Sequence, residues 1–444
     1  MNNQLDICAV VEKSRLSRFQ LLVLVQCFLC MVVDGFAIQA MAYAAPSLIA
    51  DWGIPKGNLG PVFSISMLGM LIGSLALGSV ADRVGRRPVL ISASLIMAIL
   101  MFFTAHATTV DELLILRFFT GVAMGAIVPN VATLVTEYAP RHNRVMLLTL
   151  VSSGMVVGGL LGGAIAAALI PLYGWQAVFY LGAIAPLCVG LLMLVALPES
   201  LQWCVLRGRQ LKRVKAILLR IDPTLQVNEQ TTLVIAEPRK KGLSLTLLFG
   251  YGRLRGTLLL WLINFMNMLC VYFLASWTPV LMSGAGHSPS QAVLASTSMW
   301  LGGLAGGWLL GWFVDRRGFG AVLVPTFIVS AVAILLFSHF YASINMAYLT
   351  IAVAGFGILG GQAALNAMTA TFYPTALRAT GTGWTLGIGR LGGICGPFIG
   401  ATLLNLNWST SDLLVAAAVP ASITALGIIG FWRAHRAAAL AATH

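Results

Sequence analysis

Long apolar runs alternate with short polar segments along almost the whole chain, and they form two groups of six. A helix needs about 20 apolar residues to cross a bilayer, and each run is long enough or nearly so. The first group covers residues 19–45, 58–80, 88–106, 112–136, 145–170 and 176–197. The second group covers residues 255–281, 291–314, 321–340, 346–371, 381–405 and 412–432. The pattern predicts an all-α membrane protein with twelve transmembrane helices in two six-helix bundles.

Composition supports the same class. The chain has 59% hydrophobic and only 9% charged residues, whereas soluble domains carry about 25% charged residues. The seven cysteines show no metal-ligand pattern: Cys27 and Cys30 have neither a histidine nor a further cysteine nearby, so we assign them to helix packing. The sequence therefore implies no metal, cofactor or nucleotide.

The polar segments divide the chain into five parts. We expect an N-terminal tail at 1–18, a bundle at 19–197, a middle loop at 198–254, a second bundle at 255–432 and a tail at 433–444.

Basic residues predict the orientation of these parts. All lysines and arginines except Lys56, Arg117 and Arg390 flank the face that carries both termini. The positive-inside rule places that face in the cytosol, in a bacterial-type inner membrane. The net charge of +13 thus reflects topology and not nucleic-acid binding. Contact of the middle loop with anionic lipid is an alternative, but topology alone explains its charge.

The two halves repeat each other at a nearly constant spacing. Residues 78–83 match 311–316, Pro140 and Arg144 match Pro374 and Arg378, and Gly158, Gly159 and Gly162 match Gly392, Gly393 and Gly396. The offsets are 233, 234 and 234 residues. Parallel repeats with a binding site between them at mid-depth are typical of transporters.

Several motifs resemble a known superfamily. Gly78-x-x-x-Asp82-Arg83-x-Gly85-Arg86-Arg87 resembles the loop signature of the major facilitator superfamily, and Arg117-x-x-x-Gly121-x-x-x-Gly125 and Pro198-Glu199-Ser200 resemble other motifs of it. The resemblance implies two pseudo-symmetric bundles, with spans one, four, seven and ten around a central cavity, and usually a monomer.

Within that superfamily the chain resembles the aromatic acid:proton symporters. The matching stretches are Asp34-Gly35-Phe36, Glu137-Tyr138-Ala139-Pro140 with Arg144, Tyr373 to Gly381, and Gly387 to Gly392. Members of that family typically carry a second acid three residues after the first. Here that position is Ala37, which leaves the proton stoichiometry open.

Three charged residues lie inside apolar runs, where charges are costly and usually functional. Asp34 is the candidate proton carrier; its alternative is a buried packing group. Arg117 is its expected counter-ion, since helix rise brings the two within reach of an arginine side chain; its alternative is a structural pin. Arg390 has no acid in the neighbouring spans of its half and is the candidate for the substrate carboxylate; its alternative is satisfaction by backbone carbonyls.

Amides and aromatic rings complete the expected pocket. Asn264 with Asn267, and Gln362 with Asn366, share helix faces by their spacing. Tyr272, Trp277 and Trp300 are candidates to stack on a ring. For the two tryptophans the interfacial aromatic belt is an equal alternative.

A separate set lies at the cytosolic rim, where opposite charges can hold the two halves together and release them. These gating candidates are Gly78, Asp82, Arg83, Arg86, Glu137, Arg144, Asp315, Arg316 and Arg378.

The sequence predicts a transporter that imports a small organic acid, expected to be an aromatic carboxylate, by proton symport with alternating access. One alternative is a proton-coupled exporter, although Gly158-Gly159-Leu-Leu-Gly162-Gly163 lacks the proline usual in exporters of this superfamily. Another is an importer of a non-aromatic carboxylate. A sensor or an enzyme is disfavoured, because no HExxH motif and no sizeable soluble domain are present.

Overall fold

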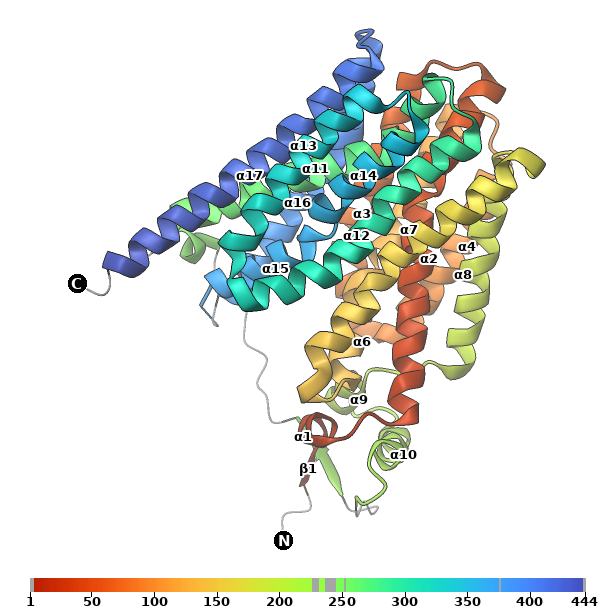
Figure 1. Cartoon of the computed structure of the whole chain (residues 1–444). Coiled ribbons are helices and arrows are strands. Elements are labelled where there is room, and N and C mark those ends of the chain that lie inside the picture. The colour runs from red at the N-terminus through yellow and green to blue at the C-terminus, as the bar shows by residue number, and fades with distance from the viewer. Residues whose placement is uncertain (1–3, 226–230, 236–244, 251–252, 375–376, 442–444) are drawn as a thin grey trace.

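A computed structural model describes residues 4–225, 231–235, 245–250, 253–374 and 377–441. Within these residues twelve helical segments are long and apolar enough to cross a membrane, which confirms the predicted all-α fold (Figure 1). The middle-loop residues Arg239 to Lys241 lie outside the described residues.

The first six spans form one bundle. They are α2 (Arg18–Trp52), η1 with α3 (Lys56–Leu59 and Gly60–Val84), α4 (Arg86–Thr104), α5 with α6 (Val110–Gly125 and Ile127–Tyr138), η2 with α7 (Arg141–Asn143 and Arg144–Tyr173) and α8 (Gln176–Ala196). The last six form the second. They are α11 (Leu254–Gly284), α12 (Pro289–Arg317), α13 (Phe319–Phe340), α14 with α15 (Ile344–Ile358 and Gly361–Phe372), α16 (Arg378–Asn405) and α17 (Thr410–Ala441).

Spans four and ten are each interrupted near their middle. The α5–α6 break includes Ala126, and the α14–α15 break includes Gly360. These positions differ by 360 − 126 = 234 residues, the spacing of the sequence repeat. The pseudo-symmetry therefore extends to the interruption of the backbone, which the apolar pattern did not predict.

Repeated glycines hold α2 against α7 in one bundle and α11 against α16 in the other. A side chain at Gly158 of α7 would overlap the backbone of Val32 in α2. Its repeat, Gly392 of α16, has the same relation to the backbone of Phe265 in α11. Small residues permit this close approach in a bilayer, where van der Waals packing drives helix association.

Replacing Gly158 with alanine is expected to destabilise the protein by about 1–3 kcal/mol, because the new methyl group overlaps fixed backbone. Gly307→Ala is the matched control, since nothing lies within 4 Å of a Cβ at that position. Thermal unfolding in one detergent measures both. Equal melting temperatures for the two variants would contradict this account of the α2–α7 contact.

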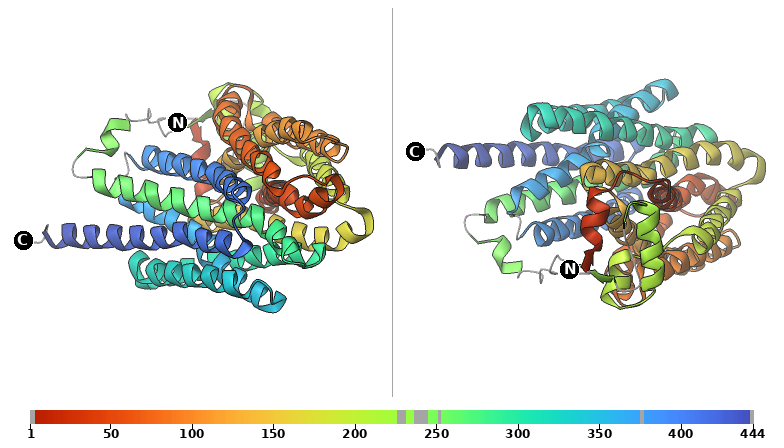
Figure 2. Two further views of the ribbon diagram at one scale, coloured as in Figure 1. Left: turned by 90° about the horizontal axis from the view of Figure 1, so that it is seen from above. Right: turned by 90° about the horizontal axis from the view of Figure 1, so that it is seen from below.

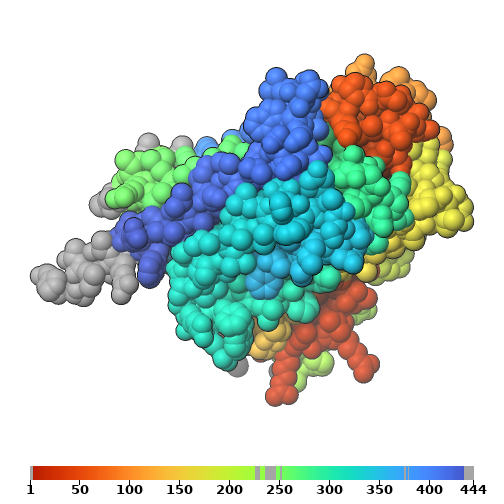
Figure 3. All heavy atoms as spheres, turned by 45° about the horizontal axis from the view of Figure 1, so that its top comes forward, coloured from red at the N-terminus to blue at the C-terminus, as the bar shows by residue number. Residues whose placement is uncertain are grey.

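The two bundles contact each other toward the face opposite the termini. There Ser64 Oγ donates to the Ile394 carbonyl at 2.9 Å, and Ser290 Oγ donates to the Ala167 carbonyl at 2.6 Å. In Figure 3 the blue C-terminal half meets the orange-red N-terminal half at the top. Toward the termini face the helices diverge (Figure 1), and a Cβ at Gly78 of α3 would meet nothing within 4 Å.

Short elements lie beneath the N-terminal bundle on the termini face (Figure 2). Strand β1 (Gln4–Asp6) pairs in parallel with β2 (Thr232–Val234) of the middle loop. Helices α1 (Ile7–Lys13), α9 (Leu201–Leu206) and α10 (Leu211–Ile221) surround this pair, and η3 (Leu245–Leu248) precedes α11. The N-terminal tail thus forms one small subdomain with α9, α10 and β2 of the middle loop.

Candidate functional site

Asp34 and Arg390 come from different bundles and lie near the middle of α2 and α16. Asp34 is fully buried, and neither of its carboxyl oxygens has a hydrogen-bond partner among the described residues. The charge of Arg390 is close enough to influence Asp34, but the two side chains form no ion pair among the described residues. Arg390 also donates from Nη1 to the hydroxyl of Ser74 in α3. The expectation for Arg390 considered acids of its own half only, so it missed this acid.

Arg117 of α5 is held by other groups. Its Nε donates to Ser66 Oγ at 3.1 Å, its Nη2 donates to the Ala37 carbonyl at 3.1 Å, and its Nη1 lies 3.5 Å from Met101 Sδ. The expected ion pair between Asp34 and Arg117 is therefore absent from this structure. The Ala37 carbonyl can take this bond because a carbonyl oxygen has two lone pairs. At position 37, where the resemblance led us to expect a second acid, the group that contacts Arg117 is thus a backbone carbonyl.

The four predicted amides form one hydrogen-bonded cluster between α11 and α15. Asn267 Nδ2 donates to Gln362 Oε1 at 2.7 Å. Gln362 Nε2 donates to Asn264 Oδ1 at 3.1 Å and to Asn366 Oδ1 at 2.9 Å. Gln362 follows directly after the break in span ten, at the second residue of α15. Asn267 Oδ1 is buried without a partner among the described residues, so the cluster can accept one further hydrogen bond.

The three candidate aromatic residues occupy different environments. Tyr272 is half-buried and interacts electrostatically with Asp34 and Arg390. Trp277 and Trp300 are only 1% exposed, so neither belongs to a lipid-facing aromatic belt.

The two tryptophans also differ from each other. Trp277 donates from Nε1 to the Pro397 carbonyl at 3.0 Å and meets the ring of Phe63 edge-on at 5.3 Å, so it forms part of the contact between the bundles. Trp300 contacts α7 at Gly159, and its buried Nε1–H has no partner in the described part of the chain.

A small cavity lies between the bundles on the side of the opposite face. Arg117, Gln39, Tyr272 and Ser276 are among its lining residues, and its volume is about 10 Å³. That is room for one water molecule at most. No organic acid fits in this cavity.

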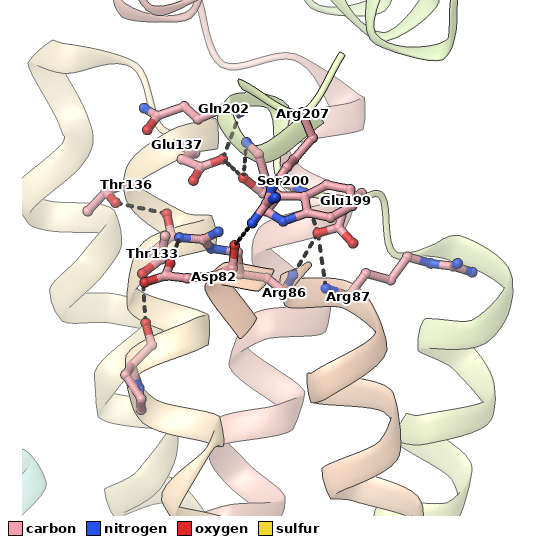
Figure 4. A network of polar contacts seen from close by, with 12 residues as sticks. Asp82, Arg86, Arg87, Thr133, Thr136, Glu137, Glu199, Ser200, Gln202 and Arg207 are labelled. Carbon is pink, nitrogen blue, oxygen red and sulfur yellow. Dashed lines mark hydrogen bonds and ion pairs between the residues drawn. The ribbon is translucent and has the colours of Figure 1, made fainter. Parts of the chain in front are cut away.

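The rim residues form a network within the N-terminal bundle (Figure 4). Asp82 pairs with Arg86 at 2.7 Å. Glu199 Oε1 accepts from the backbone N–H groups of Arg86 at 2.8 Å and Arg87 at 3.1 Å, at the start of α4. A carboxylate at a helix N-terminus satisfies free N–H groups and complements the helix dipole. Glu137 Oε2 accepts from Ser200 Oγ at 2.6 Å and so links α6 to the same segment.

The other gating candidates make contacts inside one bundle or face solvent. Arg144 pairs with Glu12 of α1 at 3.1 Å, and the Arg316 guanidinium lies 3.8 Å from the centre of the Trp312 ring. The remaining members are exposed charged side chains: Arg83, Asp315 and Arg378. Sequence reasoning missed Glu12 and the capping role of Glu199. The Pro198-Glu199-Ser200 motif was visible, but its target in α4 was not.

Two six-helix bundles that hold buried charges at their shared interface define an integral membrane transporter. The chain belongs to the Major Facilitator Superfamily, whose family model matches residues 27–397 and 260–442. Solved structures of similar proteins support the fold. A D-xylose-proton symporter superposes with a TM-score of 0.73 at 16% identity, covering 93% of this chain and 97% of the symporter. A bacterial Spinster homologue in an inward-facing and occupied conformation superposes with a TM-score of 0.73 at 17% identity, covering 94% of this chain and 98% of the homologue.

Curated relatives are transporters of aromatic acids. The 4-hydroxybenzoate transporter PcaK of Pseudomonas putida is 37% identical over 435 residues, 97% of this chain and 96% of its own. The gallate transporter of Pseudomonas putida is 35% identical, covering 96% and 94%. The benzoate transport protein of Acinetobacter baylyi is 30% identical, covering 97% and 92%. The similarity extends over nearly the whole chain, so the protein is a transporter and not an enzyme.

Proposed function

We propose that this protein imports an aromatic carboxylate across the bacterial inner membrane by proton symport, with both termini and the middle loop in the cytosol. The relatives support the substrate class. The concentration of basic residues on the termini face supports the orientation. The single observation that carries the mechanism is that Asp34 and Arg390 lie near the middle of spans from different bundles, where Asp34 is buried without a hydrogen-bond partner among the described residues.

Arg390 binds the substrate carboxylate in this proposal. A guanidinium is permanently charged and offers paired donors that match a carboxylate. The carboxylate of Asp34 lies within its electrostatic field, so a second carboxylate from the substrate competes with it. The aromatic ring lies toward Tyr272 and Trp300. Polar substituents on the ring satisfy Asn267 Oδ1 and Trp300 Nε1, which are buried without partners among the described residues.

Asp34 carries the proton. An ionised carboxylate that is buried without hydrogen bonds is costly, so loss of the attraction from Arg390 favours the neutral acid. Protonation of Asp34 removes a negative charge that competes with the substrate carboxylate for Arg390. Proton and substrate thus favour each other's binding, which raises the share of carriers loaded with both. Arg117 takes the structural role here, since its donors contact Ser66 and Ala37.

Alternating access follows from rocking of the two bundles around this site. We assign the structure to a state open toward the termini face, because the helices diverge there (Figure 1) and the contacts described above join the bundles near the opposite face. In the state open to the opposite face, the rim residues would break their contacts within one bundle and form contacts between the two bundles. The gating residues, Asp82 and Arg86 among them, are assigned to this step.

A thermal-shift screen of the purified protein tests the substrate class. Hydroxybenzoates and benzoate are expected to raise the melting temperature, because they bind the folded state only. The matching uncharged benzamides are the control and are expected to have no effect, since they offer Arg390 no anion. Stabilisation by aliphatic carboxylates alone would redirect the assignment to a non-aromatic acid. Stabilisation by neutral sugars or organic cations alone would refute the carboxylate site.

A further inference from the structure

A cleft lies beneath the N-terminal bundle, away from the transport site. Its walls are the start of α2, the end of α8 and one face of the amphipathic helix α10. The lining includes Phe19, Leu22, Val195, Arg213, Ile217 and Arg220, and the volume is about 280 Å³. None of these residues belongs to the site or to the rim network described above.

Two arginines give the cleft its charge. Arg213 and Arg220 are seven residues apart on α10, so they lie on the same helix face two turns apart. Neither forms an ion pair with an acidic side chain among the described residues. The Arg220 guanidinium lies 5.8 Å from the centre of the Phe19 ring, a cation–π contact that holds it at the end of α2. The cleft therefore presents two positive charges that form no ion pair with a described acidic side chain.

The other walls of the cleft are apolar and continue onto the outer surface of the bundle. The exposed fractions of Leu22 and Val195 are 45% and 84%. Both residues lie near the ends of spans that enter the bilayer. Basic residues thus adjoin a lipid-facing surface at the depth of the headgroups.

We propose that this cleft binds an anionic phospholipid of the cytosolic leaflet; the choice of leaflet rests on the proposed orientation. The phosphate lies between Arg213 and Arg220, and an acyl chain lies along Leu22 and Val195. Basic pockets between helices on the cytosolic side are suited to such headgroups. A soluble anion would use the arginines only and leave the apolar walls unoccupied. The bound lipid joins α10 to α2 and α8, and so attaches the subdomain to the bundle.

Native mass spectrometry of the delipidated protein tests the site with phosphatidylglycerol and phosphatidylcholine as probes. Wild-type protein is expected to retain phosphatidylglycerol in preference to phosphatidylcholine. The double variant Arg213→Gln/Arg220→Gln is expected to bind phosphatidylglycerol about 30-fold more weakly, from the contribution of each basic residue near an anionic surface. The control Arg209→Gln/Lys212→Gln removes the same charge from exposed positions of the same segment outside the cleft, and is expected to bind like wild type.

Three results would overturn the proposal. One is equal phosphatidylglycerol binding by the two double variants, which would make the effect one of net charge. Another is a wild-type protein that does not discriminate between the two lipids, and this measurement holds even where a variant fails to fold. The last is displacement of phosphatidylglycerol by inorganic phosphate at similar concentration, which would identify a free-anion site. None of these readouts depends on transport, so failure here leaves the proposed function untouched.

Discussion

Replacing Arg390 with glutamine is expected to weaken binding of an aromatic carboxylate about 10- to 100-fold. The loss corresponds to one hydrogen-bonded interaction with a charged group, about 1.5–3 kcal/mol. Glutamine retains a donor for Ser74 but supplies no charge for the substrate. Calorimetric titration of the purified variant with 4-hydroxybenzoate, or with whichever acid the screen identifies, measures the effect.

Two further variants make this result specific. Arg390→Lys keeps the charge without the paired donors and is expected to fall between wild type and glutamine. Arg433→Gln removes an exposed arginine at the end of α17 and is expected to bind normally. Full affinity in Arg390→Gln would show that the carboxylate binds elsewhere, with Arg117 as the remaining buried arginine.

Replacing Asp34 with asparagine is expected to abolish accumulation driven by a proton gradient while preserving substrate exchange. A gradient of one pH unit is worth about 1.4 kcal/mol per proton and supports about tenfold accumulation, all of which should be lost in the variant. Asparagine resembles the protonated acid permanently, so the loaded carrier still forms. Accumulation is measured in proteoliposomes with an imposed inward proton gradient. Exchange is measured in proteoliposomes with equal concentrations of labelled and unlabelled substrate on the two sides.

The pH dependence of binding gives an independent result for the same residue. In wild-type protein substrate affinity is expected to fall as pH rises, because ionised Asp34 competes for Arg390. In Asp34→Asn the substrate affinity should no longer fall as pH rises, because asparagine does not ionise. Asp111→Asn, at an exposed position in the first turn of α5, should behave like wild type in both assays. Proton-driven accumulation that survives in Asp34→Asn would remove this residue from the coupling mechanism.

Much of the fold could be predicted because its signals are local. Run length defines each span, and the glycines of α7 and α16 repeat because both must approach another backbone closely. The interruptions of spans four and ten were not predictable in this way. Gly125 and Gly360 lie at the breaks, but the uninterrupted helices α3, α7, α12 and α16 each contain four or more glycines, so nothing local distinguishes these two.

The arrangement of the site could likewise be predicted only where its signals are local. The amides of α11 and α15 were predicted because i, i+3 and i, i+4 spacing fixes a shared helix face. Asp34 and Arg390 are 356 residues apart in the sequence, so only the packing of the bundles shows that the charge of one can influence the other. The expected contact of Asp34 with Arg117 was wrong because helix rise gives the depth of a residue, not the direction in which its side chain points. The roles of all these residues in transport stay predictions.

Position 37 offers Arg117 a backbone carbonyl and no carboxylate, and this changes the charge that the carrier holds inside the membrane. With Ala37 in place of an acid, the interior of the spans carries Asp34, Arg117 and Arg390 only. In the proposed cycle the empty carrier holds −1 + 1 + 1 = +1, and the carrier with a protonated Asp34 and a bound carboxylate holds 0 + 1 + 1 − 1 = +1. Reorientation in either direction therefore moves the same charge through the membrane field, which acts at about 2.3 kcal/mol per charge per 100 mV. In the proposed cycle, a carrier with this single acid would be electroneutral: it would draw on the pH difference across the membrane and not on the voltage.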